Sequence, residues 1–283
     1  MILKHIVQRY IGAAVLALAG AFTSLSAAAA PSTWDSIVER GTLRVGVIPA
    51  RPPYFWQEDG TWVGFSVVMG EDLAKSLSQK MGKPIKVEWV ITSFTTIVLD
   101  LQADKVDAFF GMSFSEERNK AVHLAGPLYS LPSVIIKAKG VEIGDKWADF
   151  NKPNVKVVVV MGTTDEQVAR QFLPNAQIRA MKGTGEAVLD IQSRNSVAMV
   201  TTVLTGLGAL KTNSSLGSMV VLQPTNNSPS FSGTRRDGNN RFSTFLQDWA
   251  VAYRADGSAK RVMFNSMEKF GLDTSRLPPE VQF

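Results

Sequence analysis

Segments that favour strands alternate with segments that favour helices along this chain, and this alternation restricts its fold more than any other feature. A β-branched run from Val155 to Val160 suits a strand buried on both faces, and a helical pattern follows it to Phe172. Alternating strands and helices favour an α/β fold with mostly parallel sheets. Further predicted strands fall at 42–47, 85–90, 106–110 and 197–201, with helices at 66–81, 185–194, 204–210, 240–255 and 259–270.

The predicted elements form two series of similar size, one before residue 133 and one after it. At 283 residues the chain is long enough for two modest domains. We therefore expect two lobes, each a mostly parallel sheet flanked by helices.

The first 30 residues have the pattern of a secretory leader. Lys4 and Arg9 form a basic start, Ile11–Leu25 an apolar middle, and Ser26–Ala30 a small-residue end. Cleavage after Ala28 would remove residues 1–28 and export the protein to the periplasm. A retained anchor helix is the alternative, although the apolar run is short for a membrane span.

Composition excludes several kinds of site. The chain has no cysteine, so it has no disulfide, thiolate metal site or cysteine nucleophile. Its two histidines are His5, in the leader, and His123, in an apolar run where a packed strand residue is expected. The formal charge of +5 is spread over scattered Lys and Arg residues, which does not indicate nucleic-acid binding. No metal or nucleotide motif appears, and we expect no cofactor.

The segment Gly111–Arg118 is the first candidate binding site. It follows the predicted strand 106–110 and precedes a helix that Ser115 would cap near Glu116. In α/β sheets, ligands bind at the carboxyl ends of strands. Arg118 could bind a carboxylate there in a bidentate manner, with the Ser113 hydroxyl as a donor and the Gly111 carbonyl as an acceptor. Alternatively, Arg118 pairs with Glu117 or Asp107 on the surface.

Other predicted strand ends would lie on the same crevice. Arg51 with Tyr54 follows the first strand, and Phe94 follows the next one with an aromatic face to offer. Free backbone amides at Thr163 and Thr164, at a helix start, would be anion donors. Thr202 ends the strand 197–201 in the second series.

Several short segments, in this order and spacing, carry a resemblance over nearly all of residues 34–270. They are Leu43-Arg44-Val45-Gly46-Val47, Pro52-Pro53-Tyr54, Val63-Gly64-Phe65-Ser66-Val67, Lys105-Val106-Asp107-Ala108, Gly111-Met112-Ser113 with Glu117-Arg118, Gly162-Thr163-Thr164 and Ala255-Asp256-Gly257-Ser258. The chain resembles the periplasmic solute-binding proteins of ABC importers, of the amino-acid-binding type.

The resemblance implies a type II periplasmic-binding-protein fold in which ligand binding closes two lobes. Lobe one would comprise 31–133 and 234–283, lobe two 139–229, with hinges near 134–138 and 230–233. Arg118 would bind the ligand carboxylate with Ser113 and Thr164, Gly111 would accept from an ammonium, and Phe94 would stack on the ligand. The protein would be a monomer that docks on a membrane permease and would have no catalytic residue.

Two departures from the family pattern bear on the ligand. Thr202 stands where the family usually has an ammonium-binding Asp, and the first loop reads Ile48-Pro49-Ala50-Arg51 without an acid. An ammonium buried without a counter-charge is costly. We therefore expect a ligand richer in carboxylate than in ammonium, an acidic amino acid or an organic acid. Arg51 would be a second anion contact, or else a solvated loop charge.

A second resemblance, over 162–170, is to secreted cyclohexadienyl dehydratases of the same fold. There a Glu matching Glu166 acts as the catalytic acid on prephenate or arogenate, and such an acid would need a cleft position. Against this alternative, the Lys of those enzymes aligns with Ser133. Glu166 is also a favourable first-turn acid for its helix. A sensor or scaffold role is a third class, for which the sequence shows no attached module.

Overall fold

The computed structural model describes residues 31–283, so the predicted leader of residues 1–28 lies outside the described part of the chain. Its elements, in chain order, are α2 (Thr33–Arg40), β1 (Thr42–Val47), β2 (Trp56–Glu58), β3 (Thr61–Val63), α3 (Phe65–Met81), β4 (Lys86–Ile91), α4 (Ile97–Gln102), β5 (Phe109–Ser113), α5 (Glu116–Ala121), β6 (His123–Ala138), α6 (Trp147–Phe150), β7 (Lys156–Val160), α7 (Thr164–Phe172), β8 (Gln177–Met181), α8 (Thr184–Gln192), β9 (Ala198–Thr202), α9 (Val203–Thr212), β10 (Leu216–Val221), β11 (Asn227–Thr234), α10 (Arg241–Ala255) and α11 (Ser258–Lys269). None of the helices in this part is both long and apolar enough to span a bilayer.

Turn and cap residues end these elements much as the sequence predicts. Gly82 follows α3 with a φ of +66°, a left-handed conformation that glycine adopts at helix ends. Asp59 and Gly60 form the turn between β2 and β3, which pair antiparallel as a hairpin. Ser115 caps α5 by accepting a hydrogen bond from the amide of Arg118.

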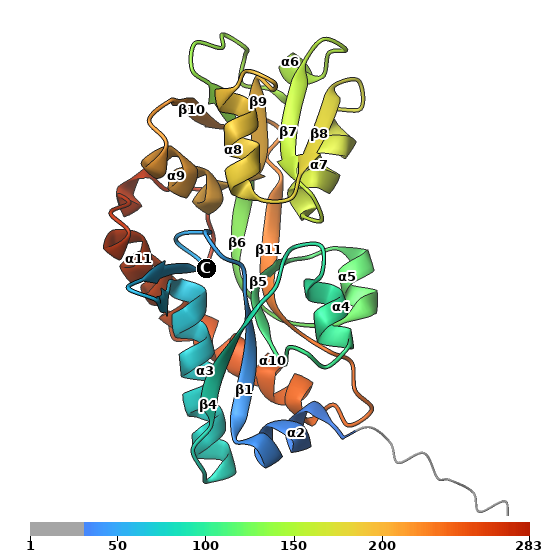
Figure 1. Cartoon of the computed structure of the whole chain (residues 1–283), viewed down its shortest axis with the longest axis vertical. Helices are drawn as coiled ribbons and strands as arrows, with labels where there is room; N and C mark the ends of the chain where they lie inside the picture. Colours follow the sequence, from blue (N-terminus) through green and yellow to red (C-terminus); the bar gives the residue numbers. More distant parts are fainter. Residues whose placement is uncertain (1–30) are drawn as a thin grey trace, which may run out of the picture. The chain divides into compact units, whose positions relative to one another are not determined.

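The sheets confirm the α/β class and add one antiparallel feature. β1 and β4 are parallel, and β7 lies parallel between β8 and β9. The two long strands β6 and β11 run side by side and antiparallel to each other (Figure 1). β6 is also antiparallel to β9 and β10, and β11 to β5. The sequence alone predicted only the parallel series.

The strand that precedes the Gly111–Arg118 segment begins later than predicted. The sequence placed it at residues 106–110, whereas β5 covers Phe109–Ser113. Residues 106–108 lie before it, and Ala108 forms only an isolated bridge with Val45. The strand is displaced because β5 pairs with β11, a partner more than 110 residues away that a local pattern cannot reveal. Gly111, Met112 and Ser113 therefore lie within the strand rather than after it.

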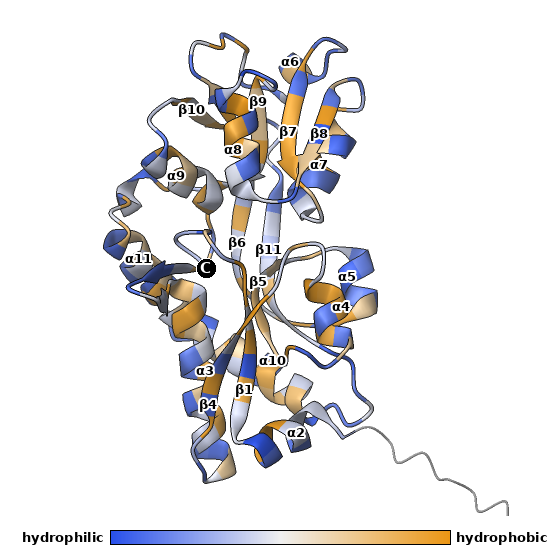
Figure 2. Cartoon of the chain, viewed as in Figure 1, coloured by the Kyte–Doolittle hydropathy of each residue, from blue (hydrophilic) through white to orange (hydrophobic). Residues whose placement is uncertain are grey.

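The valine run of β7 is buried on both faces, as its composition predicts. Val157 and Val159 contribute to a cluster with α6 and α7, while Val158 and Val160 contribute to a second cluster with α8. Figure 2 shows β7 as a hydrophobic strand next to helices that carry hydrophilic residues. A larger cluster surrounds β1, β5, α3 and α10.

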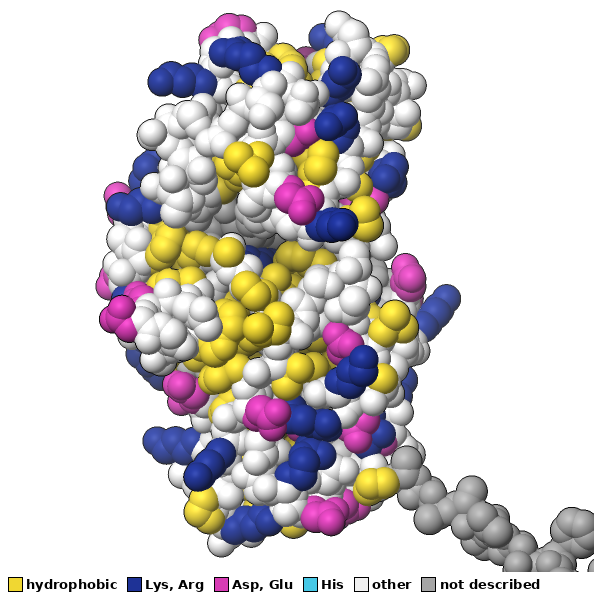
Figure 3. All heavy atoms as spheres, viewed as in Figure 1, with side chains coloured by type: hydrophobic (Ala, Val, Ile, Leu, Met, Phe, Trp, Pro, Cys, Tyr) yellow, Lys and Arg dark blue, Asp and Glu magenta, His cyan; other side chains and the backbone are white. Residues whose placement is uncertain are grey.

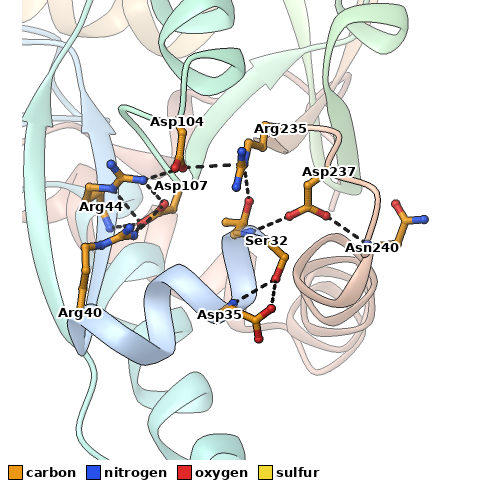
Figure 4. Close-up of polar contacts among 10 residues, drawn as sticks. Ser32, Asp35, Arg40, Arg44, Asp104, Asp107, Arg235, Asp237 and Asn240 are labelled. Atoms are coloured by element: carbon orange, nitrogen blue, oxygen red, sulfur yellow. Dashed lines mark hydrogen bonds and ion pairs between the residues drawn. The ribbon is translucent and has the colours of Figure 1, made fainter. Parts of the chain in front are cut away.

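A buried charge network joins four segments of the chain (Figure 4). The side chain of Asp107 is fully buried and accepts hydrogen bonds from the guanidinium groups of Arg40 and Arg44, at 2.7 to 3.3 Å. Arg44 also pairs with Asp104, which lies 3.7 Å from Arg235. The network fixes α2, β1 and the turn before β5 to the segment after β11.

Candidate functional site

A cleft lies at the carboxyl ends of β5, β7 and β9, each of which leads into a helix. Ligands of α/β proteins bind at this edge of a sheet. The cleft is partly open to solvent. Figure 3 shows a hollow bordered by hydrophobic side chains between the upper and lower halves of this face. The lining residues are Arg51, Phe94, Ile97, Phe109, Gly111, Met112, Ser113, Arg118, Val160, Thr163, Thr164, Asp165, Thr184, Val200, Thr201, Thr202 and Thr205.

Gly111 is a bulge residue of β5. Its neighbours Phe110 and Met112 pair with consecutive residues of β11, so Gly111 has no opposite residue. Its φ is +88°, a conformation that residues with a Cβ rarely adopt. A Cβ here would lie 3.4 Å from the Tyr54 ring and from the Tyr129 hydroxyl. The bulge places the backbone of Gly111 in the cleft wall.

Arg118 turns back from α5 over the cleft. Its Nη1 donates to the Ser113 carbonyl and its Nη2 to the Gly162 carbonyl, each at 2.9 Å. The surface alternative is wrong, because no ion pair joins Arg118 to Glu117 or Asp107 within the described chain and Asp107 is taken by Arg40 and Arg44. Burial lowers the pKa of Arg118, but a guanidinium keeps its charge and has five N–H donors.

Arg51 is buried in the cleft wall, with only 7% of its surface exposed. Its guanidinium carbon lies 3.7 Å from the ring centre of Tyr54 and 4.7 Å from that of Phe94. Stacking on two aromatic rings holds the flat group in one orientation. Within the described part of the chain, its Nε and Nη1 atoms are buried without a hydrogen-bond acceptor. A solvated loop charge is therefore the wrong description of Arg51.

The start of α7 supplies backbone donors to the cleft. The Thr163 hydroxyl caps the helix by accepting from the Glu166 amide and donates to the Val160 carbonyl, so it is fully engaged. The Thr163 amide bonds to the same carbonyl at 3.4 Å, contrary to the expectation that it is free. The amides of Thr164 and Asp165, at the first two helical positions, have no acceptor among the described residues and retain the anion-binding character of a helix start.

Asp165 is a cleft carboxylate that sequence reasoning did not identify. Only 7% of its surface is exposed, and its Oδ1 accepts a hydrogen bond from the Ser133 hydroxyl at 3.2 Å. Burial raises the pKa of Asp165 to about 6, while Ser133, Arg51 and Arg118 favour the ionised form and limit the rise. The sequence offered no signal, because an acid in the first turn of a helix is common for dipole reasons alone.

Thr202 ends β9 and presents a hydroxyl to the cleft. Its Oγ1 lies 3.1 Å from the Thr205 hydroxyl and 3.5 Å from the Tyr54 hydroxyl. Tyr54 is 1% exposed and does not line the cleft, but its ring supports Arg51. Burial raises the pKa of Tyr54, so the hydroxyl remains protonated.

Residues on opposite sides of the cleft come close together through one side-chain hydrogen bond and two close approaches of backbones. Arg118 on α5 reaches the Gly162 carbonyl, and a Cβ on Gly162 would lie 3.0 Å from the carbonyl oxygen of Phe94. A Cβ on Gly208, in α9, would lie 2.4 Å from the carbonyl oxygen of Pro52. Glycine at 162 and 208 thus permits a close approach of backbones across the cleft.

Glu166 lies beside the cleft but does not line it. Its Oε2 accepts from the Gly162 amide, and its Oε1 pairs with Arg170 one helical turn away. These are the contacts of a first-turn acid that stabilises a helix start. In this structure both carboxylate oxygens of Glu166 are therefore engaged outside the cleft wall.

Of the ligand-binding residues predicted from sequence, all but Tyr54 lie in the cleft wall: Arg51, Phe94, Gly111, Ser113, Arg118, Thr163, Thr164 and Thr202. Their contacts with a ligand remain predictions. Sequence reasoning missed Asp165, and it missed Thr184 and Thr205, which enter from α8 and α9. No group of three or more His, Asp or Glu residues in 31–283 is arranged to hold a metal ion.

Comparison with known proteins agrees with this architecture. Residues 43–263 match the family model of bacterial extracellular solute-binding proteins, family 3. A probable histidine-binding protein of Campylobacter jejuni is 29% identical over 176 residues, covering 62% of this chain and 65% of that protein. A cyclohexadienyl dehydratase of Pseudomonas aeruginosa is 30% identical over 183 residues, 62% of each chain. The matched segments thus span slightly less than two thirds of these two relatives.

A solved structure is similar over a longer range. The ancestral amino acid-binding protein AncCDT-1, described as a precursor of cyclohexadienyl dehydratase, is 31% identical with a TM-score of 0.71. The match covers 85% of this chain and 99% of that one.

Proposed function

We propose that this chain, which belongs to the bacterial extracellular solute-binding proteins, family 3, captures a small carboxylate-bearing solute between two closing lobes. It delivers this solute, an amino acid or a related organic acid, to the membrane permease of an ABC importer. The protein acts in the periplasm as a monomer, after removal of residues 1–28, and it is not an enzyme. Its relatives include both amino-acid-binding proteins and a dehydratase. The residues of the cleft therefore provide the evidence for choosing between a receptor and an enzyme.

The observation that carries the proposal is the buried, unpaired guanidinium of Arg51. A cation without a counter-charge costs free energy when it is removed from water. Two of its nitrogen atoms have no acceptor among the described residues, while its stacking fixes it at the cleft. An anionic ligand would supply the missing acceptors.

Arg118 and the start of α7 add donors from opposite sides of the cleft. The carboxylate of the solute would bind to Arg118, assisted by the Ser113 hydroxyl and the Thr164 amide. Gly111 would accept from a ligand N–H through its carbonyl, and Phe94 would pack on the ligand body. Because these donors come from two strand–helix turns that meet across the cleft, a bound anion would hold the two sides together.

We place lobe one at residues 31–133 and 234–283, lobe two at 139–229, and the hinges near 134–138 and 230–233. The separate apolar clusters on the two faces of β7 support a distinct second lobe. β6 and β11 are the strands that pass between the lobes (Figure 1). Residues 133–137 of β6 pair with β9, so a bend of β6 between the lobes would lie before Ser133, ahead of the first hinge range.

The enzymatic alternative is a cyclohexadienyl dehydratase with Glu166 as the general acid. Because a cyclohexadienyl dehydratase of Pseudomonas aeruginosa is similar to this chain, the experiment below also tests this alternative. In this chain Glu166 is bound to the Gly162 amide and to Arg170, outside the cleft wall. Ser133, at the position expected for a lysine, donates to Asp165.

The test is a thermal-shift screen of the leader-free protein against amino acids, dicarboxylates and prephenate, with product analysis for prephenate. A ligand at a hundredfold excess over its Kd stabilises a protein by about 2.7 kcal/mol, which such a screen detects. A shift with a carboxylate-bearing solute and no turnover would support the receptor. Conversion of prephenate to phenylpyruvate would favour the enzyme instead.

Arg118→Ala is expected to weaken binding of the solute found in this screen by about two to three orders of magnitude, because it removes a charged partner in a partly buried site. Arg170→Ala is the matched control, since Arg170 is exposed and pairs with Glu166 outside the cleft. Isothermal titration calorimetry measures both. Wild-type affinity in Arg118→Ala would show that the carboxylate binds elsewhere.

A further inference from the structure

We propose that Asp165 binds the ammonium group of the ligand, so that the solute of this cleft is an α-amino acid with an acidic side chain. The inference rests on the proposed receptor function and specifies its ligand. It replaces the expectation, drawn from Thr202 and the first loop, that an ammonium would meet only neutral acceptors.

The position of Asp165 is set by a chain of three side chains from three segments. Asn226 Nδ2 donates to the Ser133 hydroxyl at 3.2 Å, and that hydroxyl donates to Asp165 Oδ1 at 3.2 Å. Because the oxygen of Ser133 accepts from Asn226, its own hydrogen is directed to Asp165. The carboxylate is thereby held in the cleft wall, where the Thr202 backbone also donates to it.

A purely helix-stabilising role does not account for this arrangement. Glu166, the next residue, already accepts a backbone amide at the start of α7, as Glu186 does at the start of α8. Both acids lie outside the cleft wall. Asp165 instead accepts a backbone hydrogen bond from Thr202, at the end of β9, and has lost nearly all its exposure to water, so its charge is removed from solvent without a cation in contact.

The cations of the cleft do not neutralise Asp165 directly. Arg51 and Arg118 both favour its ionised form, yet neither makes an ion pair with it at 4.0 Å or less within residues 31–283. An ammonium could contact the carboxylate, with the Gly111 carbonyl and the Thr202 hydroxyl as further acceptors in the same wall.

The charge of the cleft wall then selects the ligand class. Its described charged residues are Arg51, Arg118 and Asp165, which sum to +1 when all are ionised. An amino acid with an acidic side chain carries −1 and matches all three groups. A neutral amino acid would leave one buried guanidinium unpaired, a dicarboxylate would leave Asp165 without a cation, and a basic amino acid would add like charge.

The experiment uses ligand pairs that differ in one group. L-Glutamate and glutarate differ by the ammonium alone, and calorimetry measures both against the wild type and Asp165→Asn. We expect the variant to lose about thirtyfold or more in affinity for glutamate, the range for truncating one member of a buried charge pair, while glutarate binds equally or more tightly. Glu186→Gln, which alters an exposed first-turn acid, is the control and should bind both as the wild type does.

A second pair tests the acidic side chain. L-Glutamate and L-glutamine are nearly isosteric, and the wild type should prefer glutamate. With the α-carboxylate on Arg118 and the ammonium on Asp165, Arg51 is the cation that remains for the side-chain carboxylate. Arg51→Met should therefore abolish this preference while leaving Arg118 and Asp165 in place. L-Aspartate is run in parallel to cover the shorter side chain.

The outcomes separate the inference from the function on which it rests. Equal losses of glutamate and glutarate in Asp165→Asn, or no loss, would overturn the role of Asp165. A wild type that binds neutral or basic amino acids more tightly than acidic ones would overturn the ligand class, while the receptor function stands. If no amino acid or dicarboxylate binds at all, the proposed function itself fails and the inference with it.

Discussion

Asp165 is the residue whose chemistry is least visible in the sequence and most dependent on its surroundings. Its neighbours are Ser133, the two guanidinium groups and the hydroxyl of Tyr54, which burial keeps neutral. Burial outweighs these stabilising partners, so the pKa of Asp165 rises from 3.8 to about 6. The folded, unliganded protein therefore holds this proton more tightly than the unfolded chain does.

This raised pKa predicts a specific pH dependence of folding stability. Between pH 4 and pH 6 the unfolded chain has released the proton and the folded chain retains it, so stability falls as pH rises. The shift from 3.8 to about 6 corresponds to roughly 3 kcal/mol, present below pH 4 and lost above pH 6. Relative to Asp165→Asn, the wild type should lose about this much between pH 4 and pH 7.5.

Urea unfolding at these two pH values measures the change, and the difference between the two proteins cancels the other titrating groups. A bound ammonium should favour the ionised carboxylate, so glutamate affinity should rise through pH 6 in the wild type only. Parallel pH profiles of the two proteins would contradict the assignment of a raised pKa to Asp165.

At the scale of elements, Asp107 connects α2 and β1 to the turn before β5, segments more than 60 residues apart in sequence. It is fully buried between Arg40 of α2 and Arg44 of β1, and it accepts from the backbone amide of Arg44 (Figure 4). Removing Asp107 would leave Arg40 without a counter-charge and Arg44 with Asp104 alone. The network thus makes the attachment of α2 to the sheet dependent on one carboxylate.

Asp107→Asn is expected to lower the free energy of unfolding by about 3 kcal/mol, because Arg40 loses its anion and Arg44 keeps only Asp104. Lys269→Gln is the control, since it breaks an exposed pair with Glu58 and should change stability little. Chemical denaturation of both variants measures the effect. A loss in Asp107→Asn no larger than that of Lys269→Gln would contradict the network's contribution.

The elements also show what a sequence can and cannot predict. Helix ends at Gly41 and Gly82 and the hairpin at Asp59-Gly60 depend on local conformation, so local residues predict them. β6 contains Pro127 and Pro132, residues that local patterns place at strand ends. It begins at His123, since its first part pairs with β11, far away in sequence.

The same limit applies to the candidate site. Arg118 and Gly111 were predicted because a strand–turn–helix pattern places them at a strand end. The stacking of Arg51 depends on Phe94, and the position of the Asp165 carboxylate depends on a hydrogen bond from Ser133, which lies 32 residues away. Local patterns do not show contacts between distant residues. The sequence therefore allowed two interpretations of Arg51, and it did not predict Asp165 as a site residue.

At the scale of the whole described molecule, closure of the cleft requires backbones to approach at points away from the ligand. Gly208 is such a point, because a Cβ there would lie 2.4 Å from the Pro52 carbonyl oxygen. Its φ is not positive and it lies inside α9. Alanine would therefore suit the helix itself, by about 1 kcal/mol, while opposing the close approach.

Gly208→Ala is thus expected to separate closure from folding. The unliganded variant should unfold at the same or a higher urea concentration, since an open cleft avoids the clash. Its affinity for the solute should fall about tenfold, because closure around the ligand must overcome overpacking of 1 to 3 kcal/mol.

Gly185→Ala, a helical glycine with no atom within 4 Å of the added Cβ, should leave affinity unchanged. In small-angle scattering, the ligand should reduce the radius of gyration of the wild type and of Gly185→Ala more than that of Gly208→Ala. Wild-type affinity and compaction in Gly208→Ala would mean that the solute is bound without this approach, and that the contact between α9 and the first loop has no part in capture.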